Sequence, residues 1–544
     1  MKHFQLPQYT FIAATLGVMA LSGANAFSQK KANAPNAPKP STAAASQAAT
    51  KAMPSTPPRA TPPDPLASEQ ECKAHLQFLA SDKLKGRMTG EAGNNEAAEY
   101  IANTFKACGV KMLPAQTTYL QPIEFRRTTP PSVFVLTLGK DTLRVGTDAL
   151  MTAGEALSAN ADVVYVGFGI VDSAAKRDDY ASAGVDVRGK IVVAKIGATD
   201  STKAREALSF SRRKREMAQS RGALAFIELM NLPAPPLWAQ LNEFTKRPLL
   251  QIPDNRTKST MPYFFVKDFD KRFTVQCEAI ATTKKPLAAV INTAGMKIEA
   301  VYSQNVAGMI QGADTALAQE YVIVSAHYDH IGSVSGTGQK DSIFNGARDN
   351  AMGTSAILAA AKAFAAKPPR RSLLLLAFTG EEMGLLGSRY YAENPLLPLN
   401  KAVYNLNIDG AGFNDTTAVT IIGLERTTAR GLIEAGAQKI GLRATADPAP
   451  EQNLFDRSDN VSFAAKGIPA PTFAPGLKAF DADIFKYYHQ LGDEAGEDFN
   501  FGYFTRFVNA YLSVSRLIAD AQERPRWFAG DKYESAFQTL YQTK

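Results

Sequence analysis

The chain has 544 residues, of which 45% are hydrophobic and 21% are charged, an ordinary composition for a globular protein. This length can hold more than one hydrophobic core, so we expect two or three domains. The formal net charge is +8, but residues 1–64 hold six Lys and Arg residues and one acid, which leaves about +3 for the remainder. This near balance argues against nucleic acid as a partner.

The first 26 residues have the pattern of a secretory signal peptide. Lys2 precedes an apolar run over 11–21, and Ala24-Asn-Ala26 is a small-x-small cleavage site. The run is shorter than a membrane-spanning helix requires. We therefore predict that residues 1–26 are removed and that the chain is exported, to the periplasm or outside the cell, with no membrane partner. An uncleaved anchor is the alternative.

Residues 27–64 consist mostly of Ala, Pro, Ser, Thr, Lys and Asn. They can bury too little apolar surface to offset their chain entropy, so we predict a disordered linker. Two helices are expected after it, over 68–80 and 94–108. Cys72 and Cys108 would lie on these helices, either joined by a disulfide or as small buried hydrophobic residues.

The pattern changes at about residue 156 to short apolar strands separated by glycine turns. A Lys/Arg-rich helix is expected over 203–222, and its basic run Arg212-Arg-Lys-Arg215 is more typical of a solvated helix face than of a polyanion site. We predict a β-rich domain over 156–287, inserted into a larger domain made of residues 65–155 and 288–544.

From residue 302 onward, buried apolar strands alternate with helices. Strands are expected to end near Ala326, Thr379 and Ile408. The pattern predicts an α/β fold, with a mostly parallel mixed sheet flanked by helices. Ligands of such sheets bind just beyond the carboxyl ends of the strands, so the residues that follow these strands are candidates for a site.

Polar residues that can bind metal ions follow these strand ends or lie in nearby loops. One such residue alone is usually a cap, a turn residue or a structural histidine, but several in one sheet favour a site. Three carboxylates and two neutral histidines, with a bridging hydroxide, would balance the charge of two Zn²⁺ ions, and manganese or cobalt could substitute. The predicted ligands are His327, Asp349, Glu382, Asp409 and His489.

Two further acids are expected to support this centre. Asp329 lies two residues after His327 and is placed to accept a hydrogen bond from its ring. Glu381 is adjacent to the predicted ligand Glu382 and is the expected general base for a bound water. The alternative for Glu381 is an exposed acid at the start of a helix.

The predicted site residues lie in five motifs: H-Y-D-H (327–330), G-A-R-D-N (346–350), F-T-G-E-E-M-G-L-L-G-S (378–388), N-I-D (407–409) and Y-Y-H-Q-L-G-D (487–493). In this order, the motifs resemble those of the co-catalytic dizinc aminopeptidase family, which includes bacterial leucyl-type aminopeptidases and, more distantly, glutamate carboxypeptidase and the transferrin receptor. The resemblance covers residues 66–520 and implies the zinc exopeptidase fold. The predicted insert resembles the protease-associated domain that many members carry at this place.

The resemblance implies how the ligands are shared between the metals. His327 and Asp409 would bind one ion, Glu382 and His489 the other, and Asp349 would bridge them. The implied cofactor is two Zn²⁺ per chain.

The resemblance also implies substrate contacts. Tyr488 matches a tyrosine that can hydrogen-bond the tetrahedral oxyanion. Arg457, Ser458 and Asp459 match a substrate-side segment that usually continues with histidine, where this chain has Asn460.

Two positions beside the motifs stand apart from the family pattern. Arg348 replaces a usual aspartate and would add positive charge beside the bridging Asp349. His330 has no role in the implied set, and we take it as a wall residue.

The sequence therefore predicts an exported zinc exopeptidase, an aminopeptidase that removes N-terminal residues from peptides by metal-activated hydroxide. A glutamate-carboxypeptidase-type enzyme is the alternative. A non-catalytic, receptor-like member should have lost ligands, and the glutaminyl cyclase branch generally lacks the insert, so both are less favoured. Peptide is the expected partner, and assembly as a homodimer stays open.

Overall fold

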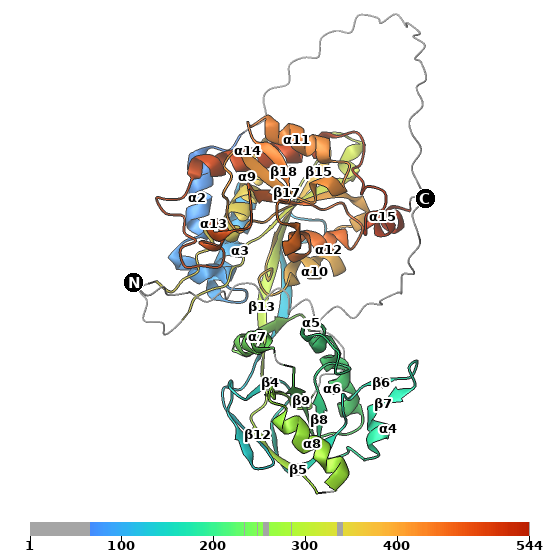
Figure 1. Cartoon of the computed structure of the whole chain (residues 1–544). Coiled ribbons are helices and arrows are strands. Elements are labelled where there is room, and N and C mark those ends of the chain that lie inside the picture. The colour runs from blue at the N-terminus through green and yellow to red at the C-terminus, as the bar shows by residue number, and fades with distance from the viewer. Residues whose placement is uncertain are drawn as a thin grey trace, which may run out of the picture.

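The computed structural model describes residues 66–542 except 233, 247, 254–259, 284 and 335–340. The predicted signal peptide and the linker up to residue 64 lie outside these residues. The described strands form two large sheets, of nine and eight strands, and a two-stranded ribbon. Figure 1 shows the two sheets in separate lobes, with the long strand β13 running between them. Within the described ranges, every helix is too short or too polar to traverse a bilayer.

The larger sheet confirms the α/β fold class. Its central strands β15, β14, β16 and β19 are parallel neighbours, and the strands that flank them, β13 and β17, are antiparallel. All residues of β14, β15 and β16 are buried, as their continuous apolar runs predict. The order from edge to edge is β10 (Leu249–Gln251), β1 (Leu120–Thr129), β13 (Lys297–Ile310), β15 (Ser372–Phe378), β14 (Tyr321–His327), β16 (Ala402–Ile408), β19 (Thr472–Pro475), β17 (Ala418–Ile422) and β18 (Arg443–Ala446).

Helices cover both faces of this sheet (Figure 1). Alternate residues of β14 enter different cores: Val322 and Val324 pack on one face, and Tyr321 and Ile323 on the other. The helices of the first core are α2 (Glu69–Leu79), α3 (Ala92–Ala107), α9 (Met352–Ala366), α11 (Arg430–Gln438) and α14 (Phe501–Asp520). Those of the second are α10 (Leu386–Glu393), α12 (Asn460–Ala464) and α15 (Glu534–Tyr541).

The smaller sheet forms the other lobe with its own helices. Its strands are β3 (Asp141–Leu143), β2 (Phe134–Leu138), β12 (Ala288–Thr293), β5 (Leu157–Tyr165), β8 (Ile191–Lys195), β9 (Ala225–Met230), β11 (Tyr263–Lys267) and β4 (Ala149–Ala153). The helices are α4 (Asp179–Ala183), α5 (Ala204–Ala207), α6 (Ser211–Ser220), α7 (Pro235–Thr245) and α8 (Arg272–Thr283), and the ribbon is β6 (Val171–Asp172) with β7 (Arg177–Asp178).

The strand pairing does not follow the predicted insert bounds of 156–287. Strands β2, β3 and β4 precede residue 156 but belong to the smaller sheet, because β12 pairs with both β2 and β5. Strand β10 lies inside the predicted range but pairs with β1 of the larger sheet. Assignment of this lobe as a protease-associated domain, with those boundaries, stays a prediction.

Side-chain positions decide one open alternative and correct one expectation. Of the two possibilities for the cysteines, the described residues show free thiols and no disulfide at Cys72, Cys108 and Cys277. The basic run on α6 is not a solvated face throughout: the Lys214 side chain is 1% exposed and paired with Glu228. The whole Lys214 side chain, with its charged end, is therefore buried, because the Glu228 carboxylate provides a counter-charge in the core.

Candidate metal centre

The parallel strands of the larger sheet deliver the predicted ligands to one edge. His327 is the last residue of β14, Glu382 lies four residues after the end of β15, and Asp409 directly follows β16. Because the three strands are parallel neighbours, their carboxyl ends meet, and residues from distant parts of the chain face one another there.

Two loops supply the remaining predicted ligands. Asp349 lies in the helical turn Ala347–Ala351, which precedes α9. The buried carboxylate of Asp493 fixes this turn by accepting hydrogen bonds from the backbone N–H groups of Arg348 (3.0 Å) and Asp349 (3.2 Å). His489 follows the short helix α13 (Ala482–Phe485) and has φ of 55°, a left-handed conformation that costs a non-glycine residue on the order of 1 kcal/mol.

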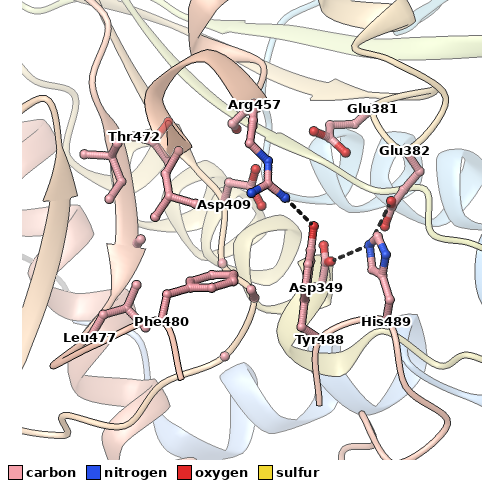
Figure 2. A pocket seen from close by; sticks show the side chains of 17 residues that line it. Asp349, Glu381, Glu382, Asp409, Arg457, Thr472, Leu477, Phe480, Tyr488 and His489 are labelled. Carbon is pink, nitrogen blue, oxygen red and sulfur yellow. Dashed lines mark hydrogen bonds and ion pairs between the residues drawn. The ribbon is translucent and has the colours of Figure 1, made fainter. Parts of the chain in front are cut away.

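The ligand atoms form two groups that share one carboxylate. His327 Nε2 lies 3.4 Å from Asp349 Oδ1 and 3.3 Å from Asp409 Oδ1. His489 Nε2 lies 3.3 Å from Asp349 Oδ2 and 3.0 Å from Glu382 Oε2 (Figure 2). Asp349 therefore presents one oxygen to each group, the arrangement expected of a bridging ligand.

The side chains of this cluster do not balance one another's charge while the histidines are neutral. Burial alone would lower the pKa of His327 and of His489, but the nearby carboxylates, Glu381 and Glu382 respectively, raise the pKa of both histidines well above the ordinary value. Burial alone would raise the pKa of Glu382, but the charge of His489 lowers it to about 2.

The donor set fits zinc. Within each group the nitrogen and carboxylate oxygen atoms lie within 4.8 Å of one another, and two divalent cations would compensate the carboxylates in place of protons on the histidines.

Asp329 holds the segment that carries the two glutamates. Its carboxylate accepts hydrogen bonds from the backbone N–H groups of Glu381 (3.2 Å) and Glu382 (3.3 Å) and from the hydroxyl of Thr89 (3.0 Å). The distance from Asp329 Oδ1 to His327 Nδ1 is 3.7 Å, and the Asp329 carbonyl oxygen is closer to that nitrogen, at 3.3 Å. Asp329 thus fixes the loop after β15 at least as directly as it supports the histidine ring.

A cavity of about 80 Å³ opens beside the two groups, and Glu381, Tyr488, Arg457 and Ser458 line it. Burial, helped by neighbouring carboxylates such as Asp409, raises the pKa of Glu381 well above the ordinary value. Arg457 donates a hydrogen bond to the Tyr488 hydroxyl at 3.2 Å (Figure 2).

Two further residues singled out in the sequence lie around the site. Asp459 is fully buried and is not among the residues that line the cavity. Burial raises its pKa to about 7. The Arg348 guanidinium pairs with Asp493 at 3.0 Å and lies 3.7 Å from the ring centre of Tyr487. These contacts help to hold the loop that carries Asp349.

Sequence reasoning missed two features of the site. His330 Nδ1 lies 2.7 Å from Glu382 Oε1, so this histidine contacts a predicted ligand. The only sequence signal was its position three residues after His327. The apolar wall of the cavity was also missed, because its residues come from separate loops and strands: Ile422, Leu454, Ala474, Leu477 and Phe480.

Comparison with known proteins confirms the family resemblance for part of the chain. Residues 305–510 match the model of peptidase family M28. Aminopeptidase YwaD of Bacillus subtilis is 32% identical over 196 residues, which are 35% of this chain and 39% of that protein. Probable glutamate carboxypeptidase AMP1 of Arabidopsis thaliana is 27% identical over 199 residues, 35% of this chain and 26% of that protein. The chain thus spans well under half the length of these curated relatives.

Among solved structures, an aminopeptidase from Aneurinibacillus sp. strain AM-1 has a TM-score of 0.52 and 21% identity, with 82% of this chain and 93% of that chain covered. At this identity the likeness shows a shared fold and nothing further.

Proposed function

We propose that this chain, whose residues 305–510 belong to peptidase family M28, is an exported exopeptidase that depends on two zinc ions and removes N-terminal residues from peptides. The observation that carries the proposal is the pair of ligand groups that share Asp349, with Glu381 beside them on a cavity. Export is supported by the signal-peptide pattern of residues 1–26.

The residues that would hold the metals are those of the two groups: His327 and Asp409 for one, Glu382 and His489 for the other, and Asp349 for both. Zinc at such a site would lower the pKa of water, so that hydroxide is available at neutral pH, and would polarise a carbonyl group.

The protein's own groups then move the proton and stabilise charge. Glu381 accepts a proton from the attacking water and passes it to the leaving amine, so that the carboxylate is restored after each turnover. Tyr488 donates a hydrogen bond from its hydroxyl to the carbonyl oxygen of the scissile bond as negative charge develops there, and keeps its proton. Arg457 can only donate hydrogen bonds, so its contact makes the Tyr488 oxygen an acceptor and leaves the phenol proton available for the substrate.

The lining of the cavity favours an N-terminal residue with an apolar side chain. The wall residues Leu477 and Phe480 face the cavity opposite the glutamates (Figure 2). Carboxylates such as Asp409 and Glu381 also line it, and they attract the ammonium group of a peptide's first residue.

One observation favours a second candidate function, that of a carboxypeptidase for C-terminal glutamate. The guanidinium of Arg457 lines the cavity and is a suitable partner for a free carboxylate. A substrate comparison separates the two functions. We expect hydrolysis of leucyl-p-nitroanilide and no release of glutamate from a peptide that ends in it; the reverse pattern would overturn the aminopeptidase assignment.

The general base is tested by Glu381→Gln. Because the amide cannot accept the proton, we expect kcat to fall by about 10²–10⁴-fold while two zinc ions per chain are retained, as measured by metal analysis. Full activity in this variant would rule out the proposed role of Glu381.

A further inference from the structure

His330 lies inside the metal centre, although no ligand role was predicted for it. Its side chain is 0% exposed, and its Nδ1 lies 2.7 Å from Glu382 Oε1. The other oxygen of that carboxylate, Oε2, lies 3.0 Å from His489 Nε2. Both oxygens of Glu382 are therefore engaged, each by a different histidine.

Distance separates two roles for His330, metal ligand and hydrogen-bond donor. Two ligand atoms on one tetrahedral zinc ion, each about 2.0–2.1 Å from the metal, lie about 3.3 Å apart. The contacts among the predicted ligand atoms range from 3.0 to 3.4 Å and suit this geometry. The 2.7 Å contact of His330 is shorter than this range and matches a hydrogen bond to a charged oxygen.

The second ring nitrogen supports the donor role. His330 Nε2 is buried and has no hydrogen-bond partner among the described residues. A proton on this nitrogen would be buried without an acceptor, whereas a proton on Nδ1 is accepted by Glu382. The arrangement therefore favours Nδ1 as the donor to Glu382.

The surroundings fix the ring in place. Gly346 packs against it so closely that a Cβ there would lie 2.6 Å from the ring atoms Cγ and Cδ2 of His330. The backbone N–H of His330 donates to the carbonyl of Arg87 at 3.3 Å. The Arg87 guanidinium in turn donates to the carbonyl oxygens of Tyr328 (2.8 Å) and Gly346 (3.1 Å), and so joins the segments on both sides of the ring.

We propose that His330 is a positioning residue, which holds Glu382 Oε1 so that Oε2 faces the metal shared with His489. The proposal rests on the two-zinc function stated above. It predicts an asymmetric effect: without His330 the ion held by Glu382 and His489 binds more weakly, and the ion held by His327 and Asp409 does not change. Loss of such a supporting hydrogen bond typically lowers metal affinity by about 10–100-fold.

The test measures zinc release from the holoenzyme into a chromogenic chelator, which does not depend on activity. His330→Leu removes the donor at similar volume, and His330→Asn keeps an N–H near the position of Nδ1. His75→Leu is the matched control, since His75 Nδ1 also makes a 2.7 Å contact, to the Tyr100 hydroxyl, on the helices α2 and α3. We expect one of two zinc ions to leave about 10–100-fold faster from His330→Leu, and wild-type release from His330→Asn and His75→Leu.

Other results overturn the proposal. Unchanged release from His330→Leu, equal acceleration of both ions, or equally fast release from His330→Asn would each contradict a donor role. If His330→Leu does not fold, His330→Ala replaces it, because the smaller side chain also lacks the donor; wild-type release from that variant would contradict the proposal. A wild-type chain that binds fewer than two zinc ions would instead overturn the proposed function itself.

Discussion

Both lobes bury ionised residues, but they balance the charges differently. In the smaller lobe, Lys214 and Glu228 are almost completely buried and pair with each other. The hydroxyl of Tyr263 donates to the second oxygen of Glu228, and Lys214 donates to the carbonyl of Lys195 at 2.7 Å. In the larger lobe, carboxylates meet at the ends of β14, β15 and β16 with three histidines among them.

The difference shows which kind of buried charge indicates a site. Burial lowers the pKa of Lys214, and the neighbouring Glu228 opposes this effect, so the pair neutralises itself within the core. The buried carboxylates around Asp349 outnumber nearby guanidinium groups such as those of Arg87 and Arg348, and neighbouring carboxylates raise the pKa of His327 and His489. Protons on these histidines, or cations, would balance the remaining charge. A buried excess of one sign, rather than buried charge as such, is what points to a bound metal.

The largest effect on the difference between the lobes is expected from removal of Asp349, the ligand that both groups share. Asp349→Ala takes one oxygen from each group, so we expect loss of both zinc ions and a fall in kcat/KM of at least about a thousandfold, about 4 kcal/mol. Metal analysis and steady-state kinetics measure these effects. Glu228→Gln is the control on the other lobe and should keep both ions; retention of two ions by Asp349→Ala would refute the bridging role.

Breaking the Lys214–Glu228 pair of the smaller lobe should lower stability and leave activity unchanged. Lys214→Met leaves Glu228 buried without its counter-charge, and we expect the free energy of unfolding to fall by about 3–5 kcal/mol with kcat unchanged. Urea unfolding measures the change. The double variant Lys214→Met, Glu228→Leu removes both charges and should recover most of the loss; a double variant as unstable as the single one would show that the charge pair is not the cause.

Metal removal should change the stability of one lobe and not of the other, and this effect should be smaller than those of the substitutions above. At a zinc concentration 100 times the dissociation constant, binding stabilises the folded state by about 2.7 kcal/mol. Chelation should therefore lower the thermal midpoint of the larger lobe, by about 5–10 °C, and leave that of the smaller lobe in place. Hydrogen exchange, followed separately for β14 and for β9, distinguishes the lobes; an equal loss of protection in both would contradict independent charge balance.

Much of the larger lobe could be predicted from local patterns. Unbroken apolar runs identified β14, β15 and β16, and the residues after them supplied the ligands, because parallel strands end at one edge. The glycines and acids of residues 378–388 are adjacent in sequence, so no long-range contact had to be guessed.

The features that local patterns did not predict have one physical origin, namely contacts between distant segments. His330 and Glu382 are 52 residues apart, and the pairing of Arg348 with Asp493 spans 145 residues. No period or spacing encodes such a partner. The burial of Asp459 could not be predicted for the same reason, since its neighbours arrive from other strands.

Strand β10 has a consequence for any attempt to shorten the chain. It comes from within the predicted insert, yet its residues Leu249–Gln251 pair with Arg126–Thr128 of β1. The chain therefore crosses to the smaller lobe between β1 and β2, returns to place β10, enters the smaller lobe again before β11, and crosses back between β12 and β13. Excision of 156–287 would leave β1 paired only with β13 and would expose the N–H and C=O groups that β10 covers, an edge where another chain can add a strand. A minimal catalytic unit would therefore need to keep Leu249–Gln251 or to cover that edge in another way.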